Sequence, residues 1–178
     1  NSTTGGVFFF QELALGEDEE GSAKLQVGGR YDGYRIASEE GEERFGLART
    51  LDFRASSGSI GLSIPVGGSA SVGVSVARAN GFHAALGSFD VGNPKLQAET
   101  NTGVDAVLRV QSGRVSGQMA AYHNRLSDYI TPNIVGDTVT DEGEEVPLNV
   151  YSQADASIGG LEGQIEAEMR PNLVVGVM

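Results

Sequence analysis

Apolar and polar residues alternate with a period of two over most of the chain, which is the pattern of strands whose two faces meet different surroundings. The alternation is clearest at 70–77, where Val72, Val74 and Val76 are separated by glycine and serine. No segment has the 3.6-residue period of an amphipathic helix. The pattern predicts about eight strands, at 7–15, 23–37, 51–64, 70–77, 101–110, 115–124, 151–169 and 173–178.

The predicted strands are long, and their connections alternate between short turns and long loops. Most predicted strands have about eight to fifteen residues, more than the usual five or six of soluble sheets, and this length suits a tilted strand that crosses a bilayer. Tight turns at one end and long loops at the other are typical of outer-membrane barrels. The predicted turns are 16–22, 65–69, 111–114 and 170–172, and the predicted long external loops are 38–49, 78–100 and 125–149.

The side chains indicate which face of the sheet meets lipid. A charge near the middle of the hydrocarbon costs up to roughly 2–4 kcal/mol, so the acidic rows belong inside. Leu161, Ile165 and Met169 then face lipid. A spanning sheet with open edges leaves backbone groups unsatisfied, so we expect an all-β, antiparallel, up-and-down transmembrane β-barrel over 1–178. The residues expected to line its interior are Asp105, Arg109, Glu162, Gln164, Glu166 and Glu168.

Composition narrows the function classes. The net charge is −12, which argues against a nucleic-acid partner. There is no cysteine, which excludes disulfides and thiolate chemistry. No apolar run approaches the roughly 18 residues of a transmembrane helix. The acidic clusters at 17–20, 39–43 and 141–145 are best explained as solvated loops.

Several motifs, taken in their order and spacing, resemble the barrel domain of the TonB-dependent outer-membrane receptors. The segment G-N-P-K-L-Q-A-E-T at 92–100 resembles the end of a long external loop of that family. L-Q-V-G-G-R-Y-D at 25–32 resembles one of its strands, and A-Y-H-N-R-L-S-D-Y-I at 121–130 resembles a strand end. Y-S-Q-A-D-A-S-I-G-G-L-E at 151–162 resembles the strand that follows.

The resemblance implies a receptor for TonB-dependent uptake of a scarce nutrient (a metal, a metal chelate or a siderophore) in the outer membrane of a Gram-negative bacterium. Its partners would be the lipid bilayer, a plug domain and the TonB energy-coupling protein. Neither the plug domain nor the TonB protein is expected to be encoded here. A complete receptor of this kind has a barrel of about 22 strands, so we expect the chain to be a segment of one. The family also has further residues where Ala79 is followed directly by Asn80.

Candidate ligand-binding residues lie in the predicted external loops. His83, with Phe82 and Asp90, is a weak candidate for binding a metal cation or another ligand, and the alternative is an ordinary loop histidine because zinc needs three or four ligands. Asp137 and Asp141 would attract cations, although their spacing does not match a calcium loop. His123 is expected to be a hydrogen-bonded histidine at the rim. We expect no firm metal site and no resident cofactor.

Two other functions remain open on the sequence alone, and we expect neither of them to involve catalysis. One is a self-contained, small outer-membrane barrel with a structural role and no transport. The other is a soluble β-sandwich that acts as a binding or adhesin module, in which Val72, Val74, Leu108 and Ile165 would be packed between two sheets. An enzyme is not expected, because the chain has no nucleophile elbow and no placed catalytic histidine.

Overall fold

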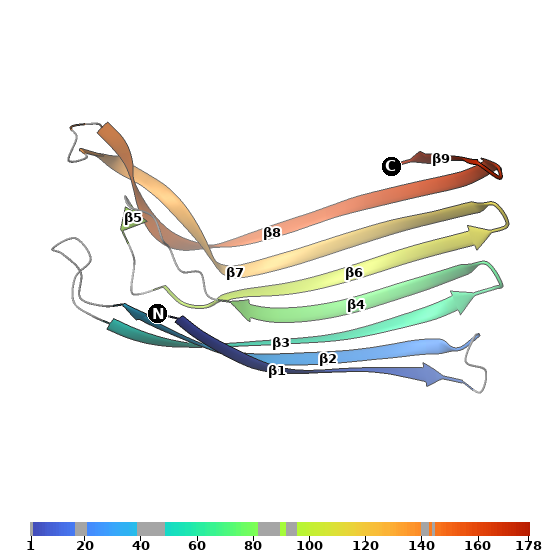
Figure 1. Cartoon of the computed structure of the whole chain (residues 1–178), viewed down its shortest axis with the longest axis horizontal. Coiled ribbons are helices and arrows are strands. Elements are labelled where there is room, and N and C mark those ends of the chain that lie inside the picture. Colours follow the sequence, from blue (N-terminus) through green and yellow to red (C-terminus); the bar gives the residue numbers. More distant parts are fainter. Residues whose placement is uncertain are drawn as a thin grey trace.

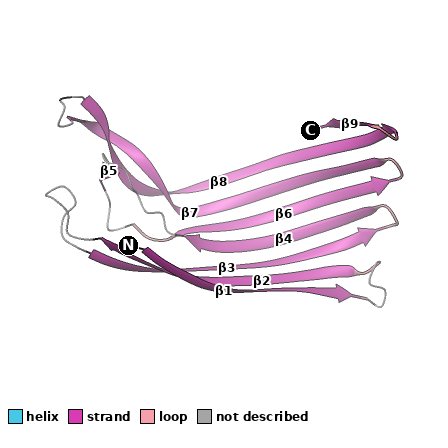
Figure 2. Cartoon of the chain, in the orientation of Figure 1, coloured by secondary structure: helices cyan, strands magenta, loops and turns pink. Residues whose placement is uncertain are grey.

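The computed structural model describes residues 2–16, 21–38, 49–81, 90–91, 96–139, 143 and 145–178. All elements in these ranges are strands (Figure 2). No helix in the described ranges has the length and apolar character needed to cross a membrane. The strands are β1 Ser2–Leu15, β2 Ala23–Ser38, β3 Arg49–Val66, β4 Ala70–Gly81, β5 Asp90–Val91, β6 Glu99–Ser112, β7 Val115–Val139, β8 Glu145–Arg170 and β9 Leu173–Val177.

Seven long strands and the short β9 form one antiparallel sheet in which each of these strands pairs with the next of them along the chain (Figure 1). The order is β1-β2-β3-β4-β6-β7-β8, with β9 against β8, and the two-residue β5 pairs in parallel with β8. The up-and-down prediction is therefore confirmed. In the described residues the sheet is open, with β1 at one edge, so it is a curved wall and not a closed cylinder.

The sheet has a single layer, and this decides against the soluble sandwich. A sandwich would bury its apolar rows between two sheets. Here Val74 is 48% exposed and Ile165 is 53% exposed. Among the described residues, Ile130 is the one large apolar side chain that is buried. The open path of strands is also not the closed eight-stranded barrel of the other alternative.

Register places apolar and polar residues in alternate rows across the sheet. Because side chains in a strand alternate between faces, neighbouring rows point to opposite sides. One row contains only aliphatic residues: Leu13, Leu25, Leu62, Val74, Ala106, Ala121 and Leu161. The next row, on the other face, contains Glu12, Gln26, Gly61, Ser75, Asp105, Tyr122 and Gly160.

The turns between the strands are as tight as predicted. The β3–β4 turn contains Gly67 at φ +64°, and the β6–β7 turn contains Gly113 at φ +57°, a conformation that glycine adopts without steric cost. Neighbouring turns are linked, since the Gln111 amide donates to the Ser69 carbonyl at 2.7 Å. These turns hold the strands in the register that separates the two faces.

At the opposite end the structure differs from the sequence prediction. Residues 125–139 and 145–149, predicted as a loop, continue β7 and β8 as a long paired hairpin. The alternation ends near Asn124, but the backbone ladder continues without it. β4 also extends to Gly81 and β6 begins at Glu99, so the predicted loop 78–100 is shorter in the structure.

Candidate functional site

The six residues predicted to line an interior share one face of the sheet. Asp105 and Arg109 are on β6, and their rows run through β7 to Gly160 and Gln164 of β8. Gly160 and Gln164 point to the same side of β8 as its three glutamates, because side chains alternate along a strand. The alternation of β8 was therefore sufficient to group its own four residues, and the register adds Asp105 and Arg109 to that face. The set is Asp105, Arg109, Glu162, Gln164, Glu166 and Glu168.

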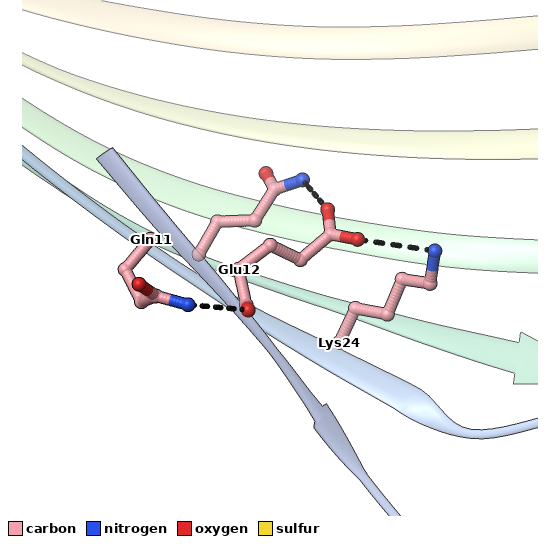
Figure 3. Close-up of polar contacts among 4 residues, drawn as sticks. Gln11, Glu12 and Lys24 are labelled. Atoms are coloured by element: carbon pink, nitrogen blue, oxygen red, sulfur yellow. Dashed lines mark hydrogen bonds and ion pairs between the residues drawn. The ribbon is translucent and has the colours of Figure 1, made fainter. Parts of the chain in front are cut away.

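This polar face carries a network of charged and amide groups. The Gln26 side chain donates to Glu12 Oε2 at 2.7 Å, and Lys24 Nζ lies 3.1 Å from Glu12 Oε1 (Figure 3). On the same face the Arg30 guanidinium binds both oxygens of Asp32 at 2.7 and 2.8 Å. Such pairs suit a wet or protein-filled interior and would be costly against hydrocarbon.

A hollow of about 680 Å³ lies on the polar face close to the turns. Its lining includes Arg109, whose Nε donates to Gln118 Oε1 at 3.1 Å, together with Gln164 and Glu166. The side chains offer one cation, one anion and three amides, those of Gln111, Gln118 and Gln164, around an open space. These groups can form hydrogen bonds with water or polar solutes in the hollow, or with another polar surface placed against it.

The apolar face is bordered by arginines toward the end where β7 and β8 form the long hairpin. Arg78 and Arg125 lie in one row on either side of Thr102, just beyond the row of Val76 and Val104. Arginines at such a border keep their charged ends in polar surroundings while their stems cover apolar surface. The arrangement marks one boundary of the apolar band.

Arg35 and Asp52 form an ion pair beyond this boundary, at 2.7 Å between Nε and Oδ1. Both side chains are mostly exposed. The hydrogen bond from Arg35 holds the pKa of the Asp52 carboxyl below its ordinary value, with the charge of Arg35 acting in the same direction. The pair links β2 and β3 near the ends of these strands that lie away from the tight turns.

The predicted ligand-binding residues are only partly within the described ranges. Phe82, His83 and Asp141 lie outside them. Asp90 belongs to β5, which pairs with Asn149 and Val150 of β8. Asp137 is exposed on β7, close to the end of the hairpin.

His123 lies on the apolar face of β7, opposite Val104 of β6 and Gly159 of β8. The described residues contain no group of three or more metal-ligating side chains.

A cluster that the sequence analysis did not identify lies where β7 is irregular. Gln153 donates to the Asp128 carbonyl at 2.8 Å and exchanges two hydrogen bonds of 2.9 Å with the backbone of Gln97. Glu99 Oε1 accepts from the Ile130 amide at 2.5 Å. The only sequence signal was the presence of these residues in the family-like motifs Q-A-E-T, S-D-Y-I and Y-S-Q-A.

Similarity to solved structures supports the same architecture. The copper transporter OprC matches 98% of this chain and 28% of its own length, at a TM-score of 0.73 and 16% identity. The siderophore receptor PirA from Pseudomonas aeruginosa matches 97% of this chain and 41% of its own, at 0.61 and 16%. The hemophore receptor HasR of Serratia marcescens, solved with HasA and heme, matches 93% and 32%, at 0.64 and 16%.

These identities establish the fold alone, and the chain spans well under half of the length of each of these proteins. The family assignment rests on a separate match. The model of the family described as "TonB dependent receptor-like, beta-barrel" matches residues 1–176, which is nearly the whole chain. This family consists of receptors and transporters, not enzymes. The chain therefore belongs to the TonB-dependent receptor β-barrel family, of which it represents part of the barrel wall.

Proposed function

We propose that this chain forms part of the barrel wall of a receptor in the outer membrane of a Gram-negative bacterium. The receptor takes up a scarce nutrient of the metal, metal-chelate or siderophore class, in a process driven by the TonB protein. The apolar face contacts lipid, and the polar face lines the interior. The side chains assigned to that interior are those of Asp105, Arg109, Glu162, Gln164, Glu166 and Glu168.

The observation that carries the proposal is that a single sheet exposes an aliphatic face on one side and a polar face on the other. A row of seven aliphatic residues crosses seven strands on one face, and the row beside it on the other face is polar or glycine. A water-soluble sheet would cover the aliphatic row, because an apolar patch of this extent is rarely left exposed. Contact with lipid accounts for both rows.

The polar face suggests the partner inside the barrel. Members of this family have a plug domain within the barrel and respond to TonB on the periplasmic side, where the tight turns would lie. The hollow lined by Arg109, Gln118 and Gln164 is close to those turns and offers groups that pair with a polar protein surface. We assign the plug to this face.

The loop end is the expected ligand side. The hairpin of β7 and β8 and the connection between β4 and β6 lie there, and they include Asp90, Asp137 and the residues Phe82, His83 and Asp141. The names of the similar structures mention copper, siderophores and heme, so these are the substrates to test first. The acidic loops would raise the local concentration of cationic substrates.

The test uses the full-length receptor that contains this chain, expressed in a Gram-negative host that lacks its own uptake systems. Uptake of Cu²⁺, heme and ferric enterobactin is measured with and without TonB. The proposal predicts an outer-membrane location and TonB-dependent uptake of one of the three. Uptake of none would contradict the substrate class. Recovery of the receptor in the soluble fraction would contradict the membrane assignment itself.

A further inference from the structure

Strand β7 contains an irregularity at Ser127 and Asp128. The pairing with β8 is regular up to Leu126 opposite Ala156 and resumes at Tyr129 opposite Ala154. Two residues of β7 thus face one residue of β8, which is a β-bulge. Asp128 adopts φ +57°, a left-handed conformation uncommon for a residue other than glycine. Such a bulge removes backbone groups of its strand from the ladder, and each needs another partner when it is covered.

Side chains from two other strands supply those partners. The Asp128 carbonyl accepts from Gln153 Nε2 at 2.8 Å. The Ile130 amide donates to Glu99 Oε1 at 2.5 Å, and the Asp128 amide donates to Asp155 Oδ1 at 3.4 Å. Ile130 is only 8% exposed, so its amide has little access to water. The bulge is therefore held by specific side chains and is more than a local defect in the ladder.

Gln153 also binds a segment far away in sequence. Its Oε1 accepts from the Gln97 amide and its Nε2 donates to the Gln97 carbonyl, both at 2.9 Å. A side-chain amide that bonds both backbone groups of one residue acts as a neighbouring strand would. Residues 96–98 have no strand assignment of their own, so this pairing fixes a stretch of loop on β8.

A second attachment joins the same connection to the same strand. β5 pairs in parallel with Asn149 and Val150 of β8, a few residues from Gln153. Figure 1 shows β5 beside the hairpin, where β7 and β8 bend together away from the other strands. The connection between β4 and β6 thus reaches past β6 and β7 to the outer part of β8.

We propose that Gln153 is a positioning residue that holds residues 96–98 and the β7–β8 hairpin together as one unit at the loop end of the wall. The unit presents the ligand-contacting residues of both segments in a fixed relation to each other. The ligand part of this statement rests on the proposed function. The mechanical part rests on the hydrogen bonds alone.

The experiment measures amide hydrogen exchange in the full-length receptor in lipid. Gln153→Leu removes all three hydrogen bonds of the side chain. Gln153→Glu keeps the acceptor for the Gln97 amide and loses both donations. Gln11→Leu, an exposed glutamine on β1 far along the sheet from the hairpin, is the matched control. We expect exchange at the Gln97 amide to be on the order of ten-fold faster in Gln153→Leu, because this amide loses its hydrogen bond to Gln153 Oε1. Gln153→Glu should show a smaller effect at Gln97, and residues 104–110 should be unchanged.

A second measurement separates positioning from local stability. Spin labels at residues 96 and 137 report the distance between the loop segment and the hairpin. The proposal predicts a narrow distribution in the parent and in Gln11→Leu, and a broad one in both Gln153 variants. An unchanged distribution in Gln153→Leu would overturn the proposal.

Binding of Cu²⁺, heme and ferric enterobactin to the same variants tests the ligand part. We expect the Gln153 variants to bind the parent's ligand on the order of ten-fold more weakly. Unchanged affinity with a broadened distribution would show that the unit has no role in ligand contact. A parent that binds none of the three would contradict the proposed function, while the distance distribution would still decide the mechanical part.

Discussion

The lower part of the wall and the β7–β8 hairpin are both antiparallel sheet, but they are held by different means. Between the turns and the row of Arg78 and Arg125, the long strands from β1 to β8 pair in continuous register, and the two faces differ sharply in polarity. Beyond that row the hairpin has two register shifts, and side chains take over part of the hydrogen bonding.

The difference follows from the surroundings that each region meets. A segment in hydrocarbon must satisfy every backbone group within the sheet, so regular register is enforced there. A segment in water or beside other loops has no such requirement, and bulges that re-aim side chains are tolerated. Under the proposed function, the regular region is thus the part that the membrane would shape, and the hairpin is the part that would be available for recognition.

The largest effect should come from a charge on the apolar face of the regular region. Val74→Arg places a cation in the aliphatic row and should cost about 2–4 kcal/mol. Ser75→Arg, the neighbouring residue on the polar face, is the control, since Asp105 lies opposite in the register. The measurement is the unfolding free energy of the full-length protein in lipid vesicles. Equal costs for the two variants would remove the distinction between the faces.

In the hairpin region the largest effect should come from Glu99. Glu99→Ala leaves the covered Ile130 amide without its acceptor, at a cost of about 1–3 kcal/mol. Glu99→Gln keeps an acceptor oxygen and should lose much less. The difference should be visible as faster amide exchange at Ile130 with no change at 104–110. Equal exchange in the two variants would show that the carboxylate does not hold the bulge.

A smaller effect is expected where a ring lies over a glycine in the regular region. A Cβ added at Gly160 would lie 2.6 Å from the hydroxyl oxygen of Tyr122, so Gly160→Ala forces the ring to move and should cost roughly 1 kcal/mol. Gly163→Ala on the same strand meets its nearest atom at 3.8 Å and is the control. The thermal unfolding midpoint compares the two, and a lower midpoint for Gly163→Ala would contradict the packing described.

The smallest effect concerns pH at the border between the regions. The pKa of Asp52 is lowered in the folded state from its ordinary value of 3.8. Its pair with Arg35 therefore stabilises the fold at pH values above 3.8. That contribution is lost as the pH falls through the lowered value. Asp52→Asn should therefore be slightly less stable than the parent at neutral pH and equally stable in strong acid. A difference between them that persists in acid would exclude the ion pair as its cause.

Much of the regular region could be predicted from the sequence. In β4 valines alternate with serine or glycine over 71–76, and period two alone assigns their faces. The turns follow from Gly67 and Gly113, which supply the positive φ angles. The alternation of β8 gave the common face of Glu162, Gln164, Glu166 and Glu168 for the same reason.

The hairpin could not be predicted in this way, because its β7 part, residues 125–139, does not alternate regularly. Pro132 and Gly136 lie within β7 and are usually signs of a loop, yet the backbone ladder continues past them. The bulge network joins residues 31 and 56 positions apart, so it depends on the register of whole strands. These residues lie in motifs that resemble the family, but the motifs do not indicate that the residues contact each other.

The central claim is that the aliphatic rows of the wall contact lipid. Because the chain has no cysteine, single cysteines can be placed at 71–76 in the full-length receptor and spin-labelled in lipid vesicles. The account predicts that labels at 72, 74 and 76 collide with oxygen dissolved in the bilayer. Labels at 71, 73 and 75 should instead collide with a water-soluble nickel reagent. Equal accessibility at all six positions, or the opposite alternation, would contradict it.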